Sequence, residues 1–450
     1  MTDLTAPQLS ESDESELASL CQLVLDSARE NGATQSEVAV SRESGLSVTV
    51  RLGEVETVEH NRDKGLSITV YHGQRKGSSS TSDFSEAAIR QSVQAACDIA
   101  KFTEEDDCAG LADADLMASE IPDLDLHHPW QLSPERAIDI AKECEQAARD
   151  YDPRVSNSEG GTVSSHQGTS AYANSHGFFA AVRGTRHSIS CSVIAEQDET
   201  MQRDYWYTVA RLADDMDSAL SVGETAAQRT VRRLGAESIT TGQYPVLFAP
   251  EMARSLLGSF VGAISGGALY RKTSFLLDCL DKPIFSSQIN ITEQPLLSRA
   301  LSSSPFDGEG VARRNRALVT DGVLNGYVLS SYSARKLGMA TTGNAGGARN
   351  VILEAGKHSP EQLLAEMDRG LLVTEMMGSG ANLTTGDYSR GAAGFWVEDG
   401  KIVHPVETVT VAGNLRDMFT AIRATGNDVN RMGNIHAGSL LIDGMTVAGK

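Results

Sequence analysis

The first hundred residues switch between helical and strand periodicity. Apolar residues recur at helical spacing over 17–28, and the pair Asn31-Gly32 marks a stop. Residues 39–51, 54–60 and 66–71 then alternate between apolar and polar side chains, as strands do. The helical period returns over 85–101. The pattern predicts an N-terminal layer, residues 17–102, in which two helices pack on an antiparallel sheet.

Residues 103–132 are acidic and irregular, and we interpret them as a connector. A central region, 133–240, begins with Ser133-Pro134, a helix N-cap followed by proline in the first turn. Alternating strand-like segments occupy 154–211, where Asn157–Gly160 and Asn174–Gly177 have the composition of hairpin turns. A helix is predicted to close this region at about residues 215–234.

The pattern changes near Thr241, where we place a domain boundary. Residues 241–450 predict short strands, with Asp321-Gly322 and Asp399-Gly400 as hairpin turns, and a helix over 250–266. Ser359–Gln362 is a capping box that opens another helix. The expected C-terminal domain is a β-dominated half-barrel or layered sheet. The fold class predicted for the chain is α+β.

Composition limits the possible partners. The chain has 450 residues and a formal net charge of −21, which argues against unassisted binding to a nucleic-acid backbone. Residues 1–16 are polar and acidic without the pattern of a secretory signal, so we expect a disordered lead-in and a cytoplasmic protein. No apolar stretch approaches membrane-spanning length. The six cysteines form no C-x-x-C pair, so neither a disulfide framework nor a zinc ribbon is indicated.

Six sequence blocks are distributed over nearly the whole chain: Gly53–Glu56, Asn157–Gly160, Asn174–Gly177, Tyr270–Ser274, Gly386–Val397 and Val447–Gly449. These blocks resemble the TldD/PmbA metallopeptidase family, and in particular its PmbA branch, also called TldE. The family has also been described as a modulator of DNA gyrase. The acidic charge of this chain argues against direct contact with DNA.

The resemblance implies that a metal site has been lost. The helix of metal-bearing members carries His-Glu-x-x-x-His, and the matching positions here are Gly258, Ser259 and Ala263. A late cysteine supplies the third ligand in those members, and Ala437 stands in its place. His436 is adjacent, but neighbouring residues on a strand point to opposite faces. Since zinc needs imidazole, thiolate or carboxylate ligands, we expect no metal in this chain and zinc only in a TldD-like partner.

The resemblance further implies a role as the non-metal subunit of a cytoplasmic heterodimeric metallopeptidase that cuts extended or unfolded peptides. Two substrates are associated with the family. One is the leader of a microcin precursor, which is cleaved during maturation of the peptide, and the other is an antitoxin, which is degraded. Two alternatives remain open. The chain could be a stand-alone, homodimeric peptide-binding protein, or an autonomous metallopeptidase with a metal site that the sequence does not reveal. No nucleic acid or membrane is expected as a partner.

The remaining candidate residues give weaker signals. His166, His176 and His187 match no compact metal motif. The Gly343–Gly347 turn lacks the Lys-Ser/Thr of a phosphate-binding loop, and Ser389 has no evident base. We expect instead that a peptide cleft is lined by two segments that the resemblance covers. The predicted cleft residues are Gly343, Asn344, Gly346, Gly347, Tyr388 and Arg390. The small residues over 262–268 predict close packing, against either this chain or a partner.

Overall fold

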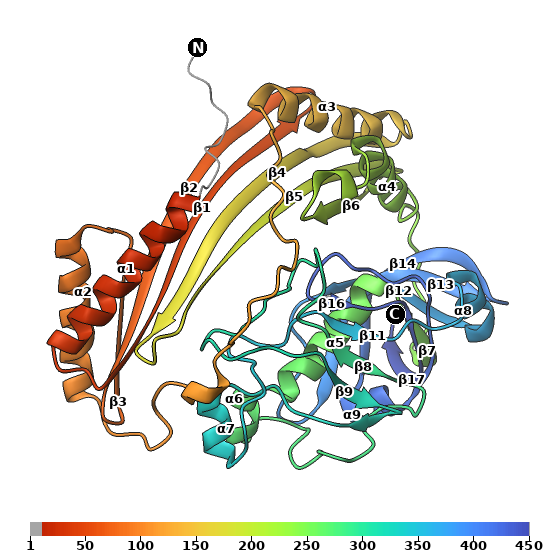
Figure 1. The fold of residues 1–450 in the computed structure, drawn as a ribbon. Coiled ribbons are helices and arrows are strands. Elements are labelled where there is room, and N and C mark those ends of the chain that lie inside the picture. The colour runs from red at the N-terminus through yellow and green to blue at the C-terminus, as the bar shows by residue number, and fades with distance from the viewer. Residues whose placement is uncertain (1–10, 450) are drawn as a thin grey trace.

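The structure is a computed structural model, and it describes residues 11–449. A long curved sheet with helices on one face forms the N-terminal part, and it arches over a more globular C-terminal part (Figure 1). In the described residues, no helix is long and apolar enough to cross a membrane. The α+β fold class predicted from the sequence is confirmed.

The curved sheet is antiparallel and has six strands in the order β3-β2-β1-β4-β5-β6. Its four long central strands each span 17 to 20 residues. The strands are β1 (Gln35–Arg51), β2 (Glu54–His72), β3 (Arg75–Thr81), β4 (Val155–Asn174), β5 (Phe179–Gln197) and β6 (Thr200–Ala210). The helices of this part are α1 (Glu11–Glu30), α2 (Glu86–Phe102), α3 (Pro134–Asp150) and α4 (Ala219–Val231).

Alternation along β1 makes the two faces of the sheet chemically different. Val38, Val40, Val48 and Val50 are buried beneath the helices, where α1 with α2 covers one end and α3 with α4 the other. The intervening positions carry small or polar side chains, and hydroxyl pairs such as Ser47–Ser164 and Thr49–Thr162 bridge β1 and β4 at 2.9 and 3.0 Å. The face turned toward the C-terminal part is therefore polar.

The C-terminal part contains two further sheets. One has the order β10-β9-β8-β11-β16, and the other has the order β14-β13-β12-β7-β17-β15. An additional pairing of β14 with β17 closes five strands of the second sheet into a ring, so the expected half-barrel is closed. The strands are β7 (Gly242–Phe248), β8 (Ile291–Glu293), β9 (Arg316–Thr320), β10 (Val323–Leu324), β11 (Val351–Leu353), β12 (Gly370–Met377), β13 (Asp387–Glu398), β14 (Lys401–Asn414), β15 (Ile422–Thr425), β16 (Ile435–His436) and β17 (Leu440–Ala448).

Five helices accompany these sheets: α5 (Pro250–Ala263), α6 (Gly266–Tyr270), α7 (Ser331–Leu337), α8 (Pro360–Met367) and α9 (Leu415–Thr420). Several local predictions are confirmed. Asp321-Gly322 and Asp399-Gly400 have positive φ at both residues and close the hairpins β9–β10 and β13–β14. Ser133 caps α3, and Ser359 forms the capping box of α8.

Three local predictions need correction. Segments 54–60 and 66–71 form one strand, β2, because β1 is long enough to pair with both. Asn157–Gly160 is not a hairpin turn but lies inside β4, where the register shifts and Gly160 has a φ of 113°. Residues 1–10 of the expected lead-in lie outside the described residues, while 11–16 belong to α1, whose Glu16 binds Arg42 of β1.

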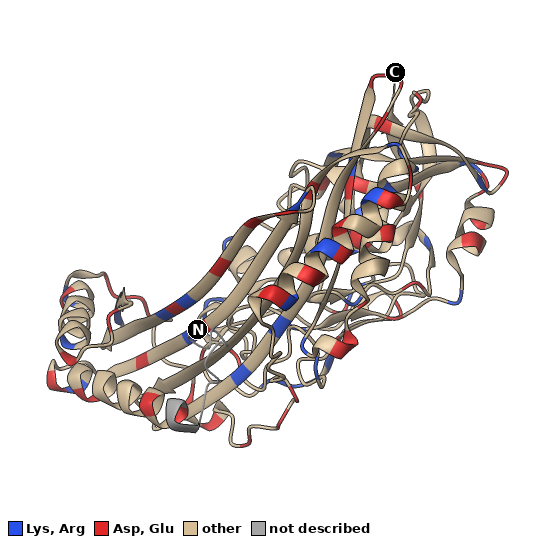
Figure 2. Cartoon of the chain, turned by 90° about the horizontal axis from the view of Figure 1, so that it is seen from above, with Lys and Arg blue, Asp and Glu red and all other residues tan. Residues whose placement is uncertain are grey.

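Ion pairs tie the curved sheet to the C-terminal part. Arg229 of α4 lies 3.5 Å from Asp204 of β6 and 3.4 Å from Glu251 of α5. The connector is attached as well, because Lys336 of α7 binds Asp106 at 2.8 Å and Arg335 donates to backbone carbonyls of residues 108–111. Acidic side chains lie along the exposed helices and loops (Figure 2).

The turn between β1 and β2 generates a testable prediction. The carboxylate of Glu145, 1% exposed on α3, accepts the Leu52 and Gly53 backbone N–H groups at 2.6 and 2.8 Å. We expect Glu145→Ala to lower the free energy of unfolding by about 3 kcal/mol, because two buried donors lose a charged acceptor. Urea unfolding followed by circular dichroism measures this change. The matched control is Glu143, which lies two residues earlier on α3 and is exposed on the opposite face of the helix. An equal effect of Glu143→Ala would contradict the assignment.

Candidate functional site

The positions predicted to replace the family's metal ligands lie on α5 and directly after β16, two elements in contact. α5 carries Gly258, Ser259 and Ala263, and it packs against β16. A Cβ built on Gly258 would lie 3.8 Å from Cδ1 of Ile435 in β16. Ala263 and Ala437 are both fully buried in the same apolar core. The helix and the strand thus bring these four positions together in one seat, and all four carry small side chains, of which Ser259 alone is polar.

The side chains around this seat do not suit a zinc ion. His436 is buried, its Nε2 lies 3.1 Å from the carbonyl of Gly433, and burial lowers its pKa. Arg254 of α5 reaches the same segment and donates to Asn430 and to the carbonyl of Met432, each at 3.0 Å. A fixed guanidinium here would repel a second cation. Residues 11–449 contain no group of three His, Cys, Asp or Glu side chains that could hold a metal ion.

The small residues after α5 pack against the chain itself. A Cβ on Gly266 would come within 2.2 Å of Oγ of Ser333 in α7, and one on Gly262 within 3.0 Å of Leu383 Cδ1. Such approaches require glycine. The structure thus assigns the close packing at residues 262–268 to the chain's own α7 and to the segment before β13.

The Gly343–Gly347 turn is held by a buried network around Glu293. This carboxylate is 1% exposed and accepts from Asn344 Nδ2 at 2.6 Å, Arg316 Nε at 2.7 Å and the Arg349 backbone N–H at 2.8 Å. Gly343, Gly346 and Gly347 all have positive φ, and only Gly346 is exposed. Asn344 anchors the turn from within, so any contact of this turn with a peptide would come from the glycines.

Tyr388 and Arg390 lie on β13, apart from that turn. Tyr388 is buried, and burial raises the pKa of its hydroxyl to about 12. Arg390 donates to Ser255 Oγ at 2.9 Å, which places its guanidinium beside α5, one turn from Gly258. Ser389 is exposed. The predicted cleft residues therefore form two groups, one behind the network of Glu293 and one beside the vacated metal helix.

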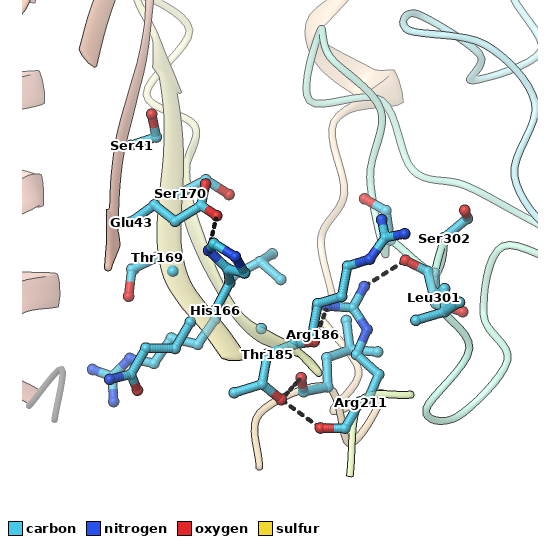
Figure 3. Close-up of a pocket in the computed structure, with 18 of the residues that line it drawn as sticks. Ser41, Glu43, His166, Thr169, Ser170, Thr185, Arg186, Arg211, Leu301 and Ser302 are labelled. Atoms are coloured by element: carbon cyan, nitrogen blue, oxygen red, sulfur yellow. Dashed lines mark hydrogen bonds and ion pairs between the residues drawn. The ribbon is translucent and has the colours of Figure 1, made fainter. Parts of the chain in front are cut away.

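The sequence reasoning missed a cavity of about 470 Å³ between the polar face of the curved sheet and the C-terminal part. Strands β1, β4 and β5 line one side, and segment 301–308 with Arg313 and Arg349 lines the other (Figure 3). Arg313 donates to the carbonyls of Ala345 and Gly347, so the glycine turn backs this wall. No sequence spacing could reveal the cavity, because its lining comes from eight separate stretches between residues 41 and 349.

Electrostatics in this cavity are dominated by arginine. Burial and the nearby charge of Arg349 lower the pKa of Arg313 to about 10, and burial together with Arg186 lowers that of Arg211. Burial raises the pKa of Asp307 to about 6, although its two oxygens accept three backbone N–H groups. The lining favours anionic ligands.

A second cavity, of about 690 Å³, adjoins the first. Both are lined by Arg211 and Leu301, and the second extends to Arg431 and His436 next to α5. Its wall is mostly aliphatic, with Val209, Leu297, Ile352, Leu353 and Val429. The two cavities are thus neighbours on either side of Arg211 and Leu301, the first at the curved sheet and the second near the seat on α5.

The three candidate histidines do not converge on one point. His166 lies 3.5 Å from Glu43 at the first cavity, and His187 is buried with its Nδ1 2.9 Å from Ser165 Oγ. His176 is exposed after the β4 strand. Their positions give no shared metal site within the described residues.

Comparisons with known proteins agree with this geometry. Models of the PmbA/TldA metallopeptidase family match residues 36–100 as domain 1, 127–234 as the central domain and 241–449 as the C-terminal domain. Metalloprotease PmbA of Escherichia coli O157:H7 is 50% identical over 95% of this chain and 94% of its own length. A PmbA homolog of Haemophilus influenzae is 45% identical over 98% of both chains.

Solved structures show the same architecture. A crystal structure from Bacteroides thetaiotaomicron superposes with a TM-score of 0.92 at 28% identity, covering 98% of this chain and 100% of that one. TldE from Thermococcus kodakarensis shares the fold, with a TM-score of 0.81 at 20% identity over 96% and 100% of the two chains. Because all three family domains match in order and close relatives cover nearly the full length, this chain belongs to the PmbA/TldA metallopeptidase family.

Proposed function

We propose that this chain is the non-metal subunit of a cytoplasmic TldD/PmbA-type metallopeptidase, which helps to bind and admit extended peptides for cleavage by a metal-bearing partner. The observation that carries the proposal is the seat on α5 and β16. Its helix and strand are intact, yet Gly258, Ser259, Ala263 and Ala437 offer neither a metal ligand nor a general base.

The cavities support the peptide-binding part of the role. The first is lined by polar strands and arginines, and the second, near α5, mostly by aliphatic side chains. Extended peptides can bind through backbone hydrogen bonds with little dependence on sequence, which suits unfolded substrates such as a leader peptide or an antitoxin. In this role the chain contributes binding and orientation, and the hydrolytic water and zinc belong to the partner's site.

A second candidate function uses the same cavities without proteolysis. The chain could act as a homodimer that holds flexible peptides. Isolation from cells separates the two possibilities, since copurification with a TldD-like subunit favours the heterodimer, whereas a stable homodimer with peptide affinity favours the binding protein.

The first prediction concerns metal content. After dialysis with equimolar zinc and gel filtration, we expect the chain to retain well below one zinc per molecule, because the seat lacks ligands and Arg254 lies beside it. Elemental analysis measures the retained metal. One zinc per chain, lost on mutation of a single histidine, would favour the autonomous metallopeptidase.

A second prediction concerns the rebuilt motif Gly258→His, Ser259→Glu, Ala263→His. We expect no more than trace peptidase activity, since Ala263 is fully buried and a larger polar ring there disturbs the core, while Ala437 still supplies no ligand. Zinc-dependent turnover is measured on a quenched fluorescent peptide, with circular dichroism as the folding control. Efficient cleavage by this variant alone would show that the orientation of the ancestral site survives.

A third prediction concerns the complex. We expect the partner alone to cut a peptide much more slowly than the pair, and Arg390→Ala in this chain to lower kcat/KM of the pair by about tenfold without changing its zinc content. The same pair with Arg314→Ala, an exposed arginine away from α5, is the matched control. A bulky residue at Gly346 should also weaken cleavage. If the partner alone is as fast as the pair, the homodimeric binding function takes precedence.

A further inference from the structure

Two arginines meet where the sheet opens into the first cavity. The β5–β6 pairing ends with His187 opposite Ala210. Arg186 and Arg211 are the next residues along the two paired segments. Arg211 donates only to backbone carbonyls, those of Thr185 at 2.9 Å and Leu301 at 2.6 Å. Arg186 is exposed, and its guanidinium forms no ion pair within residues 11–449. Both side chains extend toward Leu301 and Ser302 (Figure 3).

This arrangement leaves positive charge uncompensated. Like charges at neighbouring cross-strand positions are destabilising unless an anion lies between them. The proximity of Arg186 also lowers the pKa of Arg211, on which burial acts in the same direction. Buried donors of charged groups normally have acceptors. The Nε atoms of Arg211 and Arg349 have no hydrogen-bond acceptor among the described residues, a feature they share with five other arginines outside this cavity, so the case for a ligand rests on the neighbouring charges.

The acidic groups of the cavity do not fill this role. Both oxygens of Asp307 accept backbone N–H groups, and Glu43 lies beside His166. Arg313 is already near Glu293 at 3.8 Å. Among the described residues that line this cavity, Arg186, Arg211 and Arg349 thus carry positive charge without a carboxylate partner.

We propose that Arg186 and Arg211, with Arg349 from the C-terminal part, bind a carboxylate of an extended peptide. The inference rests on the proposed function and names a substrate class for it, namely peptides that present a carboxylate at a C-terminus or on an acidic side chain. Guanidinium groups match the planar geometry of a carboxylate in paired hydrogen bonds. The rest of such a peptide fits the adjoining aliphatic cavity, which lies near α5.

The test measures peptide binding to the full chain by calorimetry at low salt. The probes are a neutral eight-residue peptide of Ala, Leu and Ser with a free C-terminal carboxylate, its C-terminal amide, and the amide carrying one internal Glu. The variant is Arg186→Gln, which removes an exposed side chain without an ion pair and should leave the fold intact. Arg136→Gln on α3, also exposed and remote from the cavity, removes the same charge as a control. Inorganic phosphate serves as a competitor.

We expect at least one carboxylate peptide to bind about tenfold more tightly than the neutral amide, as one charge-assisted contact allows, and Arg186→Gln to abolish that preference while Arg136→Gln preserves it. Comparing the free acid with the Glu peptide identifies the source of the carboxylate. Equal binding of all three peptides, or a preference that Arg186→Gln leaves unchanged, would overturn the carboxylate site and leave the proposed function standing. Binding of phosphate without any peptide preference would also overturn it. Failure of every peptide to bind overturns this inference, and turnover of the pair then decides the proposed function separately.

Discussion

The buried carboxylate of Glu293 is the interaction on which the organisation of the site depends. It sits at the end of β8 and is met by the amide of Asn344, the guanidinium of Arg316 and the backbone of Arg349. An uncompensated buried carboxylate would be very costly, so these groups must hold one arrangement. That arrangement holds the Gly343–Gly347 turn through Asn344, and it fixes the backbone position of Arg349, which follows the turn. One wall of the first cavity is therefore anchored to a buried hydrogen-bond network.

The opposite wall depends on the asymmetry of the curved sheet. Helices cover only one face, and the valines of β1 lie beneath them. The other face carries hydroxyls and charged side chains, so it can line a water-filled cavity without exposing apolar side chains to water. Ion pairs from Arg229 to Asp204 and Glu251 hold this sheet against the C-terminal part. The distance between the walls is thus set by these ion pairs and by the hydrogen bond from Arg211 to the Leu301 carbonyl within the cavity lining.

The charge around the first cavity is opposite in sign to the net charge of the molecule. The chain is strongly acidic, yet arginines gather around the interior cavity. A negative exterior keeps nucleic acid away, while a recessed positive pocket attracts small anionic groups. This separation places the positive charge of Arg186, Arg211, Arg313 and Arg349 inside a molecule with an acidic surface.

The sequence by itself determined the elements with strong local signals and the family. Tight hairpin turns require positive φ at both central residues, and the two Asp-Gly pairs formed such turns. The Ser-Pro pairs at residues 133–134 and 359–360 start helices α3 and α8. The residue types at Gly258, Ser259, Ala263 and Ala437 could also be judged from the sequence, because ligand chemistry depends on residue type. Tertiary structure decided what local signals cannot specify. It merged two predicted strands into β2 and turned Asn157–Gly160 into a bulge, since the pairing partner sets strand length and register. It also brought Arg186, Arg211 and Arg349 to one cavity from positions far apart in the chain, because only long-range packing of two domains creates that space.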